Sequence, residues 1–240
     1  MDTTSATSRR TLLMGAAATL GMLGIAGSTA HAADAQPTPR PAFVPEPVRF
    51  VDAGPQGIAV TFDDGPDPVY TPQVLRVLER HRVRATFCVV GTEVERHPEL
   101  VRAIHDDGHA IAGHSWSHPN LQQLDPGGVA AEVERNLTAI DRAVPGYRVT
   151  WFRAPYGRWS PEVMGTLTAS GLRPLGWSVD PRDWERPGAT EIAERVLADT
   201  TTGSIILNHD AGGARDQTVA ALEVWLPRLL RRGYRFVQPT

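Results

Sequence analysis

The stretch Ile58-Ala59-Val60-Thr61-Phe62-Asp63-Asp64-Gly65-Pro66 places two adjacent carboxylates at the end of an apolar run. The run is rich in β-branched and aromatic residues, which favours a buried strand, and Gly65-Pro66 predicts a turn directly after it. Two neighbouring carboxylates repel each other unless an opposite charge lies close to them. The aspartate pair at the mouth of a buried strand therefore indicates a site that holds a cation.

Apolar, β-rich runs alternate with segments of helical period from this strand to the end of the chain. The expected strands are 58–62, 85–90, 109–113, 149–152, 173–179, 204–208 and 235–238. The expected helices are 72–81, 98–107, 126–143, 161–170, 189–202 and 216–232. Thr71-Pro72 and Ser160-Pro161 are typical helix starts, and Gly108 and Gly233 are typical helix ends. The alternation predicts an α/β fold with a parallel sheet, either closed into a barrel or open and doubly wound.

The composition excludes several classes of protein. The chain of 240 residues has a formal net charge of −3, which argues against a nucleic-acid partner. All 24 basic residues apart from histidine are arginines, and the absence of lysine excludes a Walker-type phosphate loop and Schiff-base chemistry. Cys88 is the single cysteine, which excludes an intramolecular disulfide and a cysteine-ligated metal cluster.

The first 54 residues have the composition of a targeting signal and a linker. Arg9-Arg10 precedes a mild apolar stretch, and Ala30-His31-Ala32 has the small-x-small pattern of a cleavage site. We therefore expect a twin-arginine-type signal peptide over residues 1–32, a Pro-rich linker over 33–54 and one folded domain over 55–240. The expected product is secreted or held in the cell envelope, with no stable membrane span after cleavage.

Ionisable or metal-capable residues follow five of the expected strands on their carboxyl side. These groups are Asp63-Asp64, His114 to His118, Arg153 to Tyr156, Asp180 to Trp184, and Asn208 to Asp210. In barrels and in open parallel sheets, the ligand site lies at the carboxyl ends of the strands. We therefore expect these loops to converge on one site.

The two histidines of the second group have the spacing of a metal site. Pro119 disfavours helix at His118, so we expect His114 and His118 on one tight loop. Two imidazoles and one carboxylate form a common catalytic zinc shell with an open position for water. One aspartate of the pair would then bind the metal while the other accepts a proton from that water. A calcium loop or a helix cap are the alternatives for the pair, but the calcium-loop register is absent and neither alternative accounts for the buried run.

The five groups resemble, in order, the motifs of the polysaccharide deacetylases, the NodB-homology enzymes of carbohydrate esterase family four. The resemblance extends over about residues 56–238. It implies a distorted (β/α)7 barrel and an enzyme that removes acetyl groups from an acetylated polysaccharide or oligosaccharide, with N-acetylglucosamine polymers such as chitin oligomers or peptidoglycan as the expected substrate. An acetylxylan esterase, a metal-dependent phosphoesterase and a non-catalytic carbohydrate-binding relative are the alternatives.

The resemblance also implies the metal and the acid–base pair. Asp64, His114 and His118 would hold a divalent metal, zinc in the first place, with Co²⁺ and Ni²⁺ as alternatives. Asp63 would be the general base and His209 the general acid. We expect a monomer.

Further residues are implied as supports or as substrate contacts. Arg153 would pair with Asp63, Asp183 would hold the imidazolium of the general acid, and the backbone N–H of Tyr156 would bind the oxyanion. Aromatic residues near the motifs are candidates for stacking on sugar rings: Tyr156, Trp184, Trp116 and Trp159.

Overall fold

The computed structural model describes residues 46–240. The twin-arginine-type signal expected over residues 1–32, and the linker as far as residue 45, lie outside the described residues. Within residues 46–240, no helix combines the length and the apolarity that crossing a membrane requires.

The seven strands pair in parallel and form the expected distorted (β/α)7 barrel. They are β1 (Gly57–Asp63), β2 (Thr86–Val89), β3 (Ala110–Gly113), β4 (Trp151–Phe152), β5 (Arg173–Pro174), β6 (Ile205–His209) and β7 (Arg235–Phe236). Their order is β5-β4-β3-β2-β1-β6, and β7 pairs with the amino-terminal end of β1. β4, β5 and β7 have two residues each and are shorter than the apolar runs predict.

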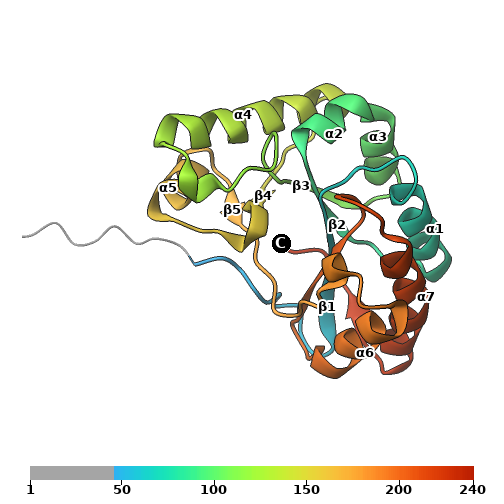
Figure 1. Ribbon diagram of the computed structural model, residues 1–240. Helices are drawn as coiled ribbons and strands as arrows, with labels where there is room; N and C mark the ends of the chain where they lie inside the picture. The colour runs from blue at the N-terminus through green and yellow to red at the C-terminus, as the bar shows by residue number, and fades with distance from the viewer. Residues whose placement is uncertain (1–45) are drawn as a thin grey trace, which may run out of the picture. The chain divides into compact units, whose positions relative to one another are not determined.

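Helices surround the strands in an arc (Figure 1). They are α1 (Thr71–His81), α2 (Gly91–Arg96), α3 (Pro98–Asp106), α4 (Pro126–Ala143), α5 (Pro161–Ala169), α6 (Ala189–Asp199) and α7 (Asp216–Arg231). Short 3₁₀ turns, η1 (Leu121–Gln123), η2 (Pro155–Gly157) and η3 (Asp183–Glu185), lie in the loops. The sequence pattern did not predict α2, because six residues before Pro98 are too few to show a helical period.

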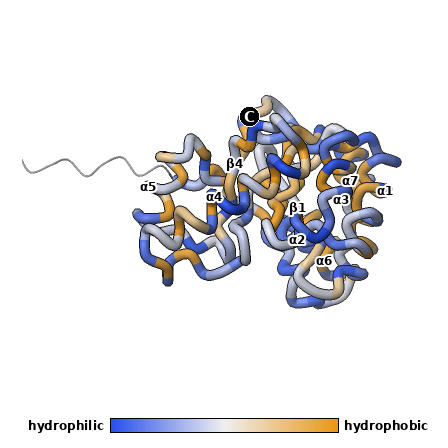
Figure 2. Tube along the Cα trace, turned by 90° about the horizontal axis from the view of Figure 1, so that it is seen from above, coloured by the Kyte–Doolittle hydropathy of each residue, from blue (hydrophilic) through white to orange (hydrophobic). Residues whose placement is uncertain are grey.

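The central strand β1 packs differently on its two faces. Ile58, Val60 and Phe62 belong to the main hydrophobic core, which the strands share with α1, α3, α6 and α7. Ala59 belongs to a smaller cluster inside the barrel, and Asp63 points to the same side because side chains alternate along a strand. The helices show the complementary pattern, with hydrophobic and hydrophilic segments alternating along α1 and α7 (Figure 2). β1 therefore directs its last side chain into the barrel.

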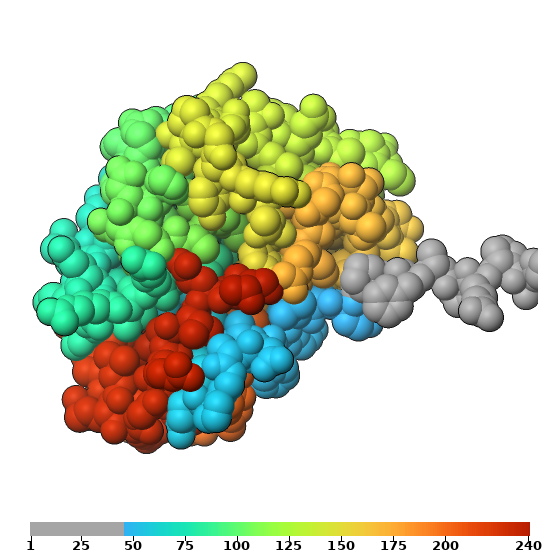
Figure 3. All heavy atoms as spheres, turned by 180° about the vertical axis from the view of Figure 1, so that it is seen from behind, coloured from blue at the N-terminus to red at the C-terminus, as the bar shows by residue number. Residues whose placement is uncertain are grey.

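Residues 46–51, here called the amino-terminal segment, close the gap between β5 and β6. Val48 forms a bridge with Leu175, and Phe50 forms one with Ser204. The backbone N–H of Val48 donates to Pro174 O at 2.9 Å, and that of Gly176 donates to Val48 O at 2.8 Å. Figure 3 shows the segment lying against the chain around β5. These hydrogen bonds make the segment part of the folded unit, which therefore extends upstream of the boundary expected at residue 55.

Candidate active site

Both aspartates at the end of β1 face the interior of the barrel. Asp63 is buried, and Asp64 follows it with a φ of 75°. This left-handed backbone conformation turns the chain, so that two successive side chains reach the same side instead of opposite sides. The Oδ1 atom of Asp64 lies 3.5 Å from His114 Nε2 and 3.2 Å from His118 Nε2.

The two imidazoles come from the loop after β3. The Nδ1 atom of His114 lies 2.7 Å from the carbonyl oxygen of Arg153, so Nδ1 carries the proton and Nε2 is free to bind a metal. His118 has a φ of 59° and lies outside any helix, as the neighbouring proline predicts. One donor atom from each of Asp64, His114 and His118 lies within 4.8 Å of the other two. Two imidazole nitrogens and one carboxylate oxygen are a donor set that suits a divalent transition metal.

The imidazoles hold Asp64 in its charged form. Burial raises the pKa of Asp64, but hydrogen bonds with His114 and His118 and the charge of His209 outweigh burial, so the pKa lies well below its ordinary value. The carboxylate is therefore ionised at neutral pH, which is the form that binds a cation.

A fully buried arginine holds the other aspartate. Arg153 follows β4, and its Nη1 donates to Asp63 Oδ1 at 2.6 Å and to Thr61 Oγ1 at 2.8 Å. Its Nε donates to Leu175 O at 3.2 Å and its Nη2 to Gly176 O at 2.8 Å. Burial lowers the pKa of Arg153, but the charge of Asp63 raises it more, so the guanidinium stays charged. This network fixes the Asp63 carboxylate beside the potential metal ligands Asp64, His114 and His118.

A second charged pair lies at the end of β6. The Nδ1 of His209 lies 2.7 Å from Asp183 Oδ1, and the backbone N–H of His209 donates to Asp183 Oδ2 at 2.8 Å. The Thr218 hydroxyl donates to the same Oδ2 at 2.9 Å. Burial lowers the pKa of His209, but the negative charges of Asp183 and of the more distant aspartates outweigh burial and raise the pKa to about 9. His209 is therefore protonated at neutral pH and able to donate a proton.

Tyr156 lies at the edge of the site in a strained backbone conformation. It is 63% exposed and has a φ of 60° within η2. Its hydroxyl lies 3.2 Å from His118 Nδ1. Within residues 46–240, its backbone N–H donates to no protein acceptor. This amide is therefore available to a ligand.

One cleft of about 430 Å³ is lined by six of the residues described above: Asp63, Asp64, His114, His118, Tyr156 and His209. Its walls also include Trp184, Trp177, Arg158, Asp180 and Leu207. The structure does not bring the other two aromatic candidates into the cleft. Trp116 packs against the main core and under the guanidinium of Arg135 at 4.1 Å, and Trp159 packs against the cluster beside α5. Trp177, which is not among the aromatic candidates from the sequence, lies in the wall.

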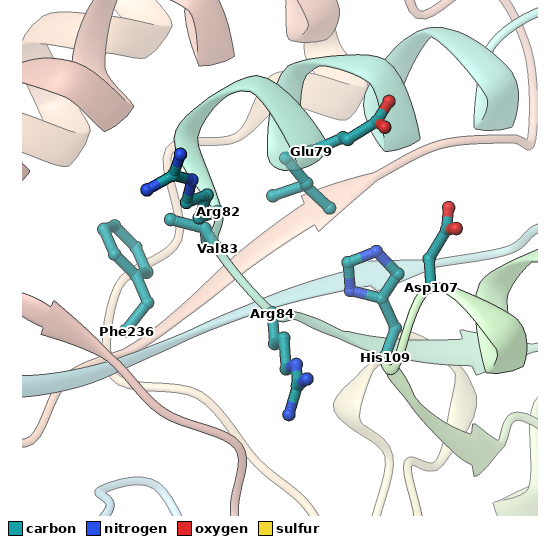
Figure 4. Close-up of a pocket in the computed structure, with 8 residues that line it drawn as sticks. Glu79, Arg82, Val83, Arg84, Asp107, His109 and Phe236 are labelled. Carbon is teal, nitrogen blue, oxygen red and sulfur yellow. The ribbon is translucent and has the colours of Figure 1, made fainter.

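A second hollow of similar size, about 450 Å³, lies at the opposite ends of the strands (Figure 4). It is lined by Val83 and Arg84 before β2, by Asp107 and His109 before β3, and by Phe236 of β7. Ligand sites of parallel α/β folds lie at the carboxyl ends of the strands. Position and chemistry therefore both favour the cleft that contains Asp63 and His209.

The buried residue next to the general-acid candidate has a structural partner. Asp210 is buried and accepts a hydrogen bond from the Thr71 hydroxyl at 2.5 Å. Burial raises the pKa of Asp210 to about 7, although this hydrogen bond lowers it. The interaction ties the start of α1 to the end of β6.

Comparisons with known proteins identify the family. The sequence model described as polysaccharide deacetylase matches residues 51–175, and the chain belongs to this family. The chain is 44% identical over 193 residues to a chitooligosaccharide deacetylase of Bradyrhizobium sp. (strain ANU 289), covering 76% of this chain and 88% of that protein. It is 39% identical to a peptidoglycan-N-acetylglucosamine deacetylase of Bacillus cereus, covering 75% and 84%.

Solved structures support the same assignment. A peptidoglycan N-acetylglucosamine deacetylase in complex with a naphthalenyl N-oxidanyl-benzamide superposes with a TM-score of 0.76 at 34% identity, over 79% of this chain and 88% of that chain. A family 4 carbohydrate esterase from Streptomyces lividans in complex with acetate gives a TM-score of 0.71 at 31% identity, over 76% and 92%. The chain is thus a polysaccharide deacetylase with the fold of carbohydrate esterase family four.

Proposed function

We propose that this protein is a metal-dependent hydrolase that removes the N-acetyl group from N-acetylglucosamine oligomers. The observation that carries the proposal is the position of Asp63. It lies beside the Asp64–His114–His118 donors, with its Oδ2 3.8 Å from His114 Nε2, yet Arg153 engages its other oxygen. A carboxylate held next to a metal site but outside its ligand set suits a general base.

The metal would be held by Asp64, His114 and His118, and we propose zinc, with Co²⁺ or Ni²⁺ as substitutes. When bound, such an ion polarises the acetyl carbonyl and lowers the pKa of a water molecule. The three donors leave further positions open, as catalytic zinc sites require. The ionised state of Asp64 favours cation binding at neutral pH.

The remaining chemistry falls to residues of the chain. Asp63 accepts a proton from the attacking water, and Arg153 keeps the carboxylate oriented toward it. The backbone N–H of Tyr156 donates a hydrogen bond to the oxyanion of the tetrahedral intermediate. His209, which Asp183 holds protonated, gives its proton to the departing nitrogen. Acetate and a free amine on the sugar are the products.

The substrate class follows from the relatives and from the cleft. The curated relatives are named for chitooligosaccharides and for peptidoglycan N-acetylglucosamine. Trp184 is 48% exposed and, like Tyr156, lines the cleft, where its ring can stack on a sugar. We propose that the protein acts as a monomer and is exported by the twin-arginine-type signal.

The test is acetate release from chitooligosaccharides, peptidoglycan and acetylxylan, measured side by side with the purified protein. We expect release from at least one N-acetylglucosamine substrate, loss on treatment with a chelator, and recovery with Zn²⁺ or Co²⁺. Release from acetylxylan alone would identify an O-acetyl esterase instead. Binding of chitooligosaccharide without acetate release, with metal present, would identify a carbohydrate-binding relative.

A further inference from the structure

A carboxylate outside the cleft holds the loop that carries the two histidines. Glu132 lies in α4 and accepts three hydrogen bonds from this loop. Its Oε2 accepts from the backbone N–H of Trp116 at 2.9 Å and from that of Ser117 at 2.8 Å. Its Oε1 accepts from the Ser117 hydroxyl at 2.8 Å. One side chain thus binds the two residues in the middle of the His114–His118 loop.

The loop has a conformation that needs such support. Ser115 has a φ of 65° and His118 a φ of 59°, and both values cost free energy in residues other than glycine. Backbone hydrogen bonds to α2 fix the carbonyl groups of the loop, from Gly91 N to Ser115 O at 3.0 Å and from Thr92 N to Trp116 O at 2.9 Å. These bonds leave the N–H groups of Trp116 and Ser117 to Glu132.

Two neighbours of Glu132 show that this face of α4 as a whole supports the site. Arg135 stacks over the ring of Trp116 at 4.1 Å. Asn136 is buried, and its Nδ2 donates to Val89 O at 2.9 Å, at the end of the strand next to β3. Positions 132, 135 and 136 lie on one side of a helix because residues three and four apart are neighbours there. The helix therefore presents an acceptor, a cation and an amide donor to the strand ends around the histidines.

We propose that Glu132 is a positioning residue for the metal site: it fixes the loop so that His114 and His118 face Asp64 before any metal binds. The proposal rests on the metal site proposed above. Without the carboxylate, two backbone N–H groups lose their acceptor, and the loop can relax out of its left-handed conformation. The histidines would then have to be ordered on binding, which weakens the affinity for the metal.

Three variants separate the geometry of Glu132 from its charge. Glu132→Gln keeps the size of the side chain but replaces one acceptor oxygen with an N–H₂ donor. Glu132→Asp keeps the charge but shortens the side chain by one methylene group, so it cannot span the same distance. Glu134→Gln is the matched control, because Glu134 is exposed, lies on the same helix, and makes no hydrogen bond to the loop within the described residues.

The first measurement is Co²⁺ affinity, determined by competition with a chromophoric chelator. We expect the dissociation constant to rise roughly 10- to 100-fold in Glu132→Gln and in Glu132→Asp, and to stay at the wild-type value in Glu134→Gln. Wild-type affinity in both Glu132 variants would overturn the proposal. So would wild-type affinity in Glu132→Asp, because the effect would then come from charge and not from position.

The second measurement is amide hydrogen exchange over residues 114–118 in the metal-free protein. We expect exchange at Trp116 and Ser117 to be roughly 3- to 10-fold faster in both Glu132 variants than in wild type. Unchanged exchange would refute the support of the loop by Glu132. If wild type bound no Co²⁺ at all, the proposed metal site would fail, and the exchange rates would still decide whether Glu132 holds the loop.

Discussion

Asp63 and His209 occupy paired positions in the neighbouring parallel strands β1 and β6. Adjacent strands lie about 4.8 Å apart, so the sheet itself sets the separation between the proposed base and the proposed acid. Each residue then has its own buried partner, Arg153 for Asp63 and Asp183 for His209. The proposed proton acceptor and proton donor are therefore held by backbone pairing as well as by side-chain contacts.

Replacing the proposed base should separate catalysis from metal binding. We expect Asp63→Asn to lower kcat for acetate release by roughly 10²- to 10⁴-fold, because the attacking water loses its proton acceptor. Metal content should stay at the wild-type level, since Asp63 is not among the three grouped donors. Acetate assays and metal analysis of the same preparation check both parts, with Asp199→Asn at the exposed end of α6 as the control. Undiminished turnover would contradict the role.

The proposed acid should matter more for amides than for esters. An amine is a poor leaving group without a proton, whereas an alkoxide leaves more readily, so His209→Gln should reduce amide hydrolysis by the larger factor. The comparison uses kcat on an N-acetyl and an O-acetyl substrate under the same conditions. Equal losses on the two substrates would assign His209 to another role, such as structure.

The partner of the acid should set the alkaline limb of the pH profile. A general acid acts only when protonated, so activity falls as the pH rises above its pKa. Burial alone lowers the pKa of His209, and Asp183 is the first of the charges that raise it to about 9. Asp183→Asn should therefore move the alkaline limb of kcat/KM to lower pH, by about 1 to 3 pH units. An unmoved limb would show that another group controls it.

Loss of the buried guanidinium should cost stability as well as activity. Arg153→Met leaves the Asp63 carboxylate buried without its counter-charge, for which a destabilisation of about 3–5 kcal/mol is typical. Urea unfolding measures this free energy. The double variant Arg153→Met with Asp63→Asn should recover part of the loss, because no unpaired charge remains. A single variant as stable as wild type would contradict this account.

Acid should destabilise the fold through His109. Its Nδ1 accepts a hydrogen bond from the Ala85 N–H at 3.0 Å, which requires the neutral ring. Burial and the charge of Arg84 lower the pKa of His109 and Asp107 raises it, and the net result is a pKa of about 4 (Figure 4). Because the unfolded chain binds the proton more tightly, this stability is complete above pH 6.5 and is lost as the pH falls toward 4, by about 2–3 kcal/mol.

His109→Asn tests the acid effect, because an amide oxygen can replace the acceptor but does not titrate. The free energy of unfolding should then depend less on pH between about 6.5 and 4. His105→Asn, which replaces a partly exposed histidine in α3, is the control and should keep the wild-type slope. A slope that is the same in all three proteins would exclude His109 as the cause.

Local patterns in the sequence predicted which strands are followed by ionisable residues of the site. They did not predict the residues that hold those side chains in place. The residues that follow β1, β3, β4 and β6 are recognisable because each closes an apolar run. Glu132 and Thr218 gave no such signal, since a polar residue on an amphipathic helix looks the same whether it faces water or a loop distant in sequence. Trp116 shows the converse error, because its position between two histidines says nothing about the direction of its ring.

The bounds of the strands were harder to predict for a related reason. The run 173–179 is mostly apolar, but only Arg173–Pro174 pairs with β4. The next residues pair instead with the amino-terminal segment and with β6, through the bridges of Leu175 and Val179. Hydrophobicity predicts that such a run is buried, but it does not specify which neighbour satisfies the backbone.

The amino-terminal segment limits how far the folded domain can be shortened at its amino-terminal end. Val48 bonds to the backbone on both sides of Leu175, and the carbonyl groups of Leu175 and Gly176 accept the guanidinium hydrogens of Arg153. A shortened protein that starts at residue 55 would keep every motif but would lose the hydrogen bonds of Val48 to Pro174 and Gly176. The carboxylate of Asp63 would then be held less firmly, because the backbone around Leu175 that anchors Arg153 would have lost its hydrogen bonds to Val48.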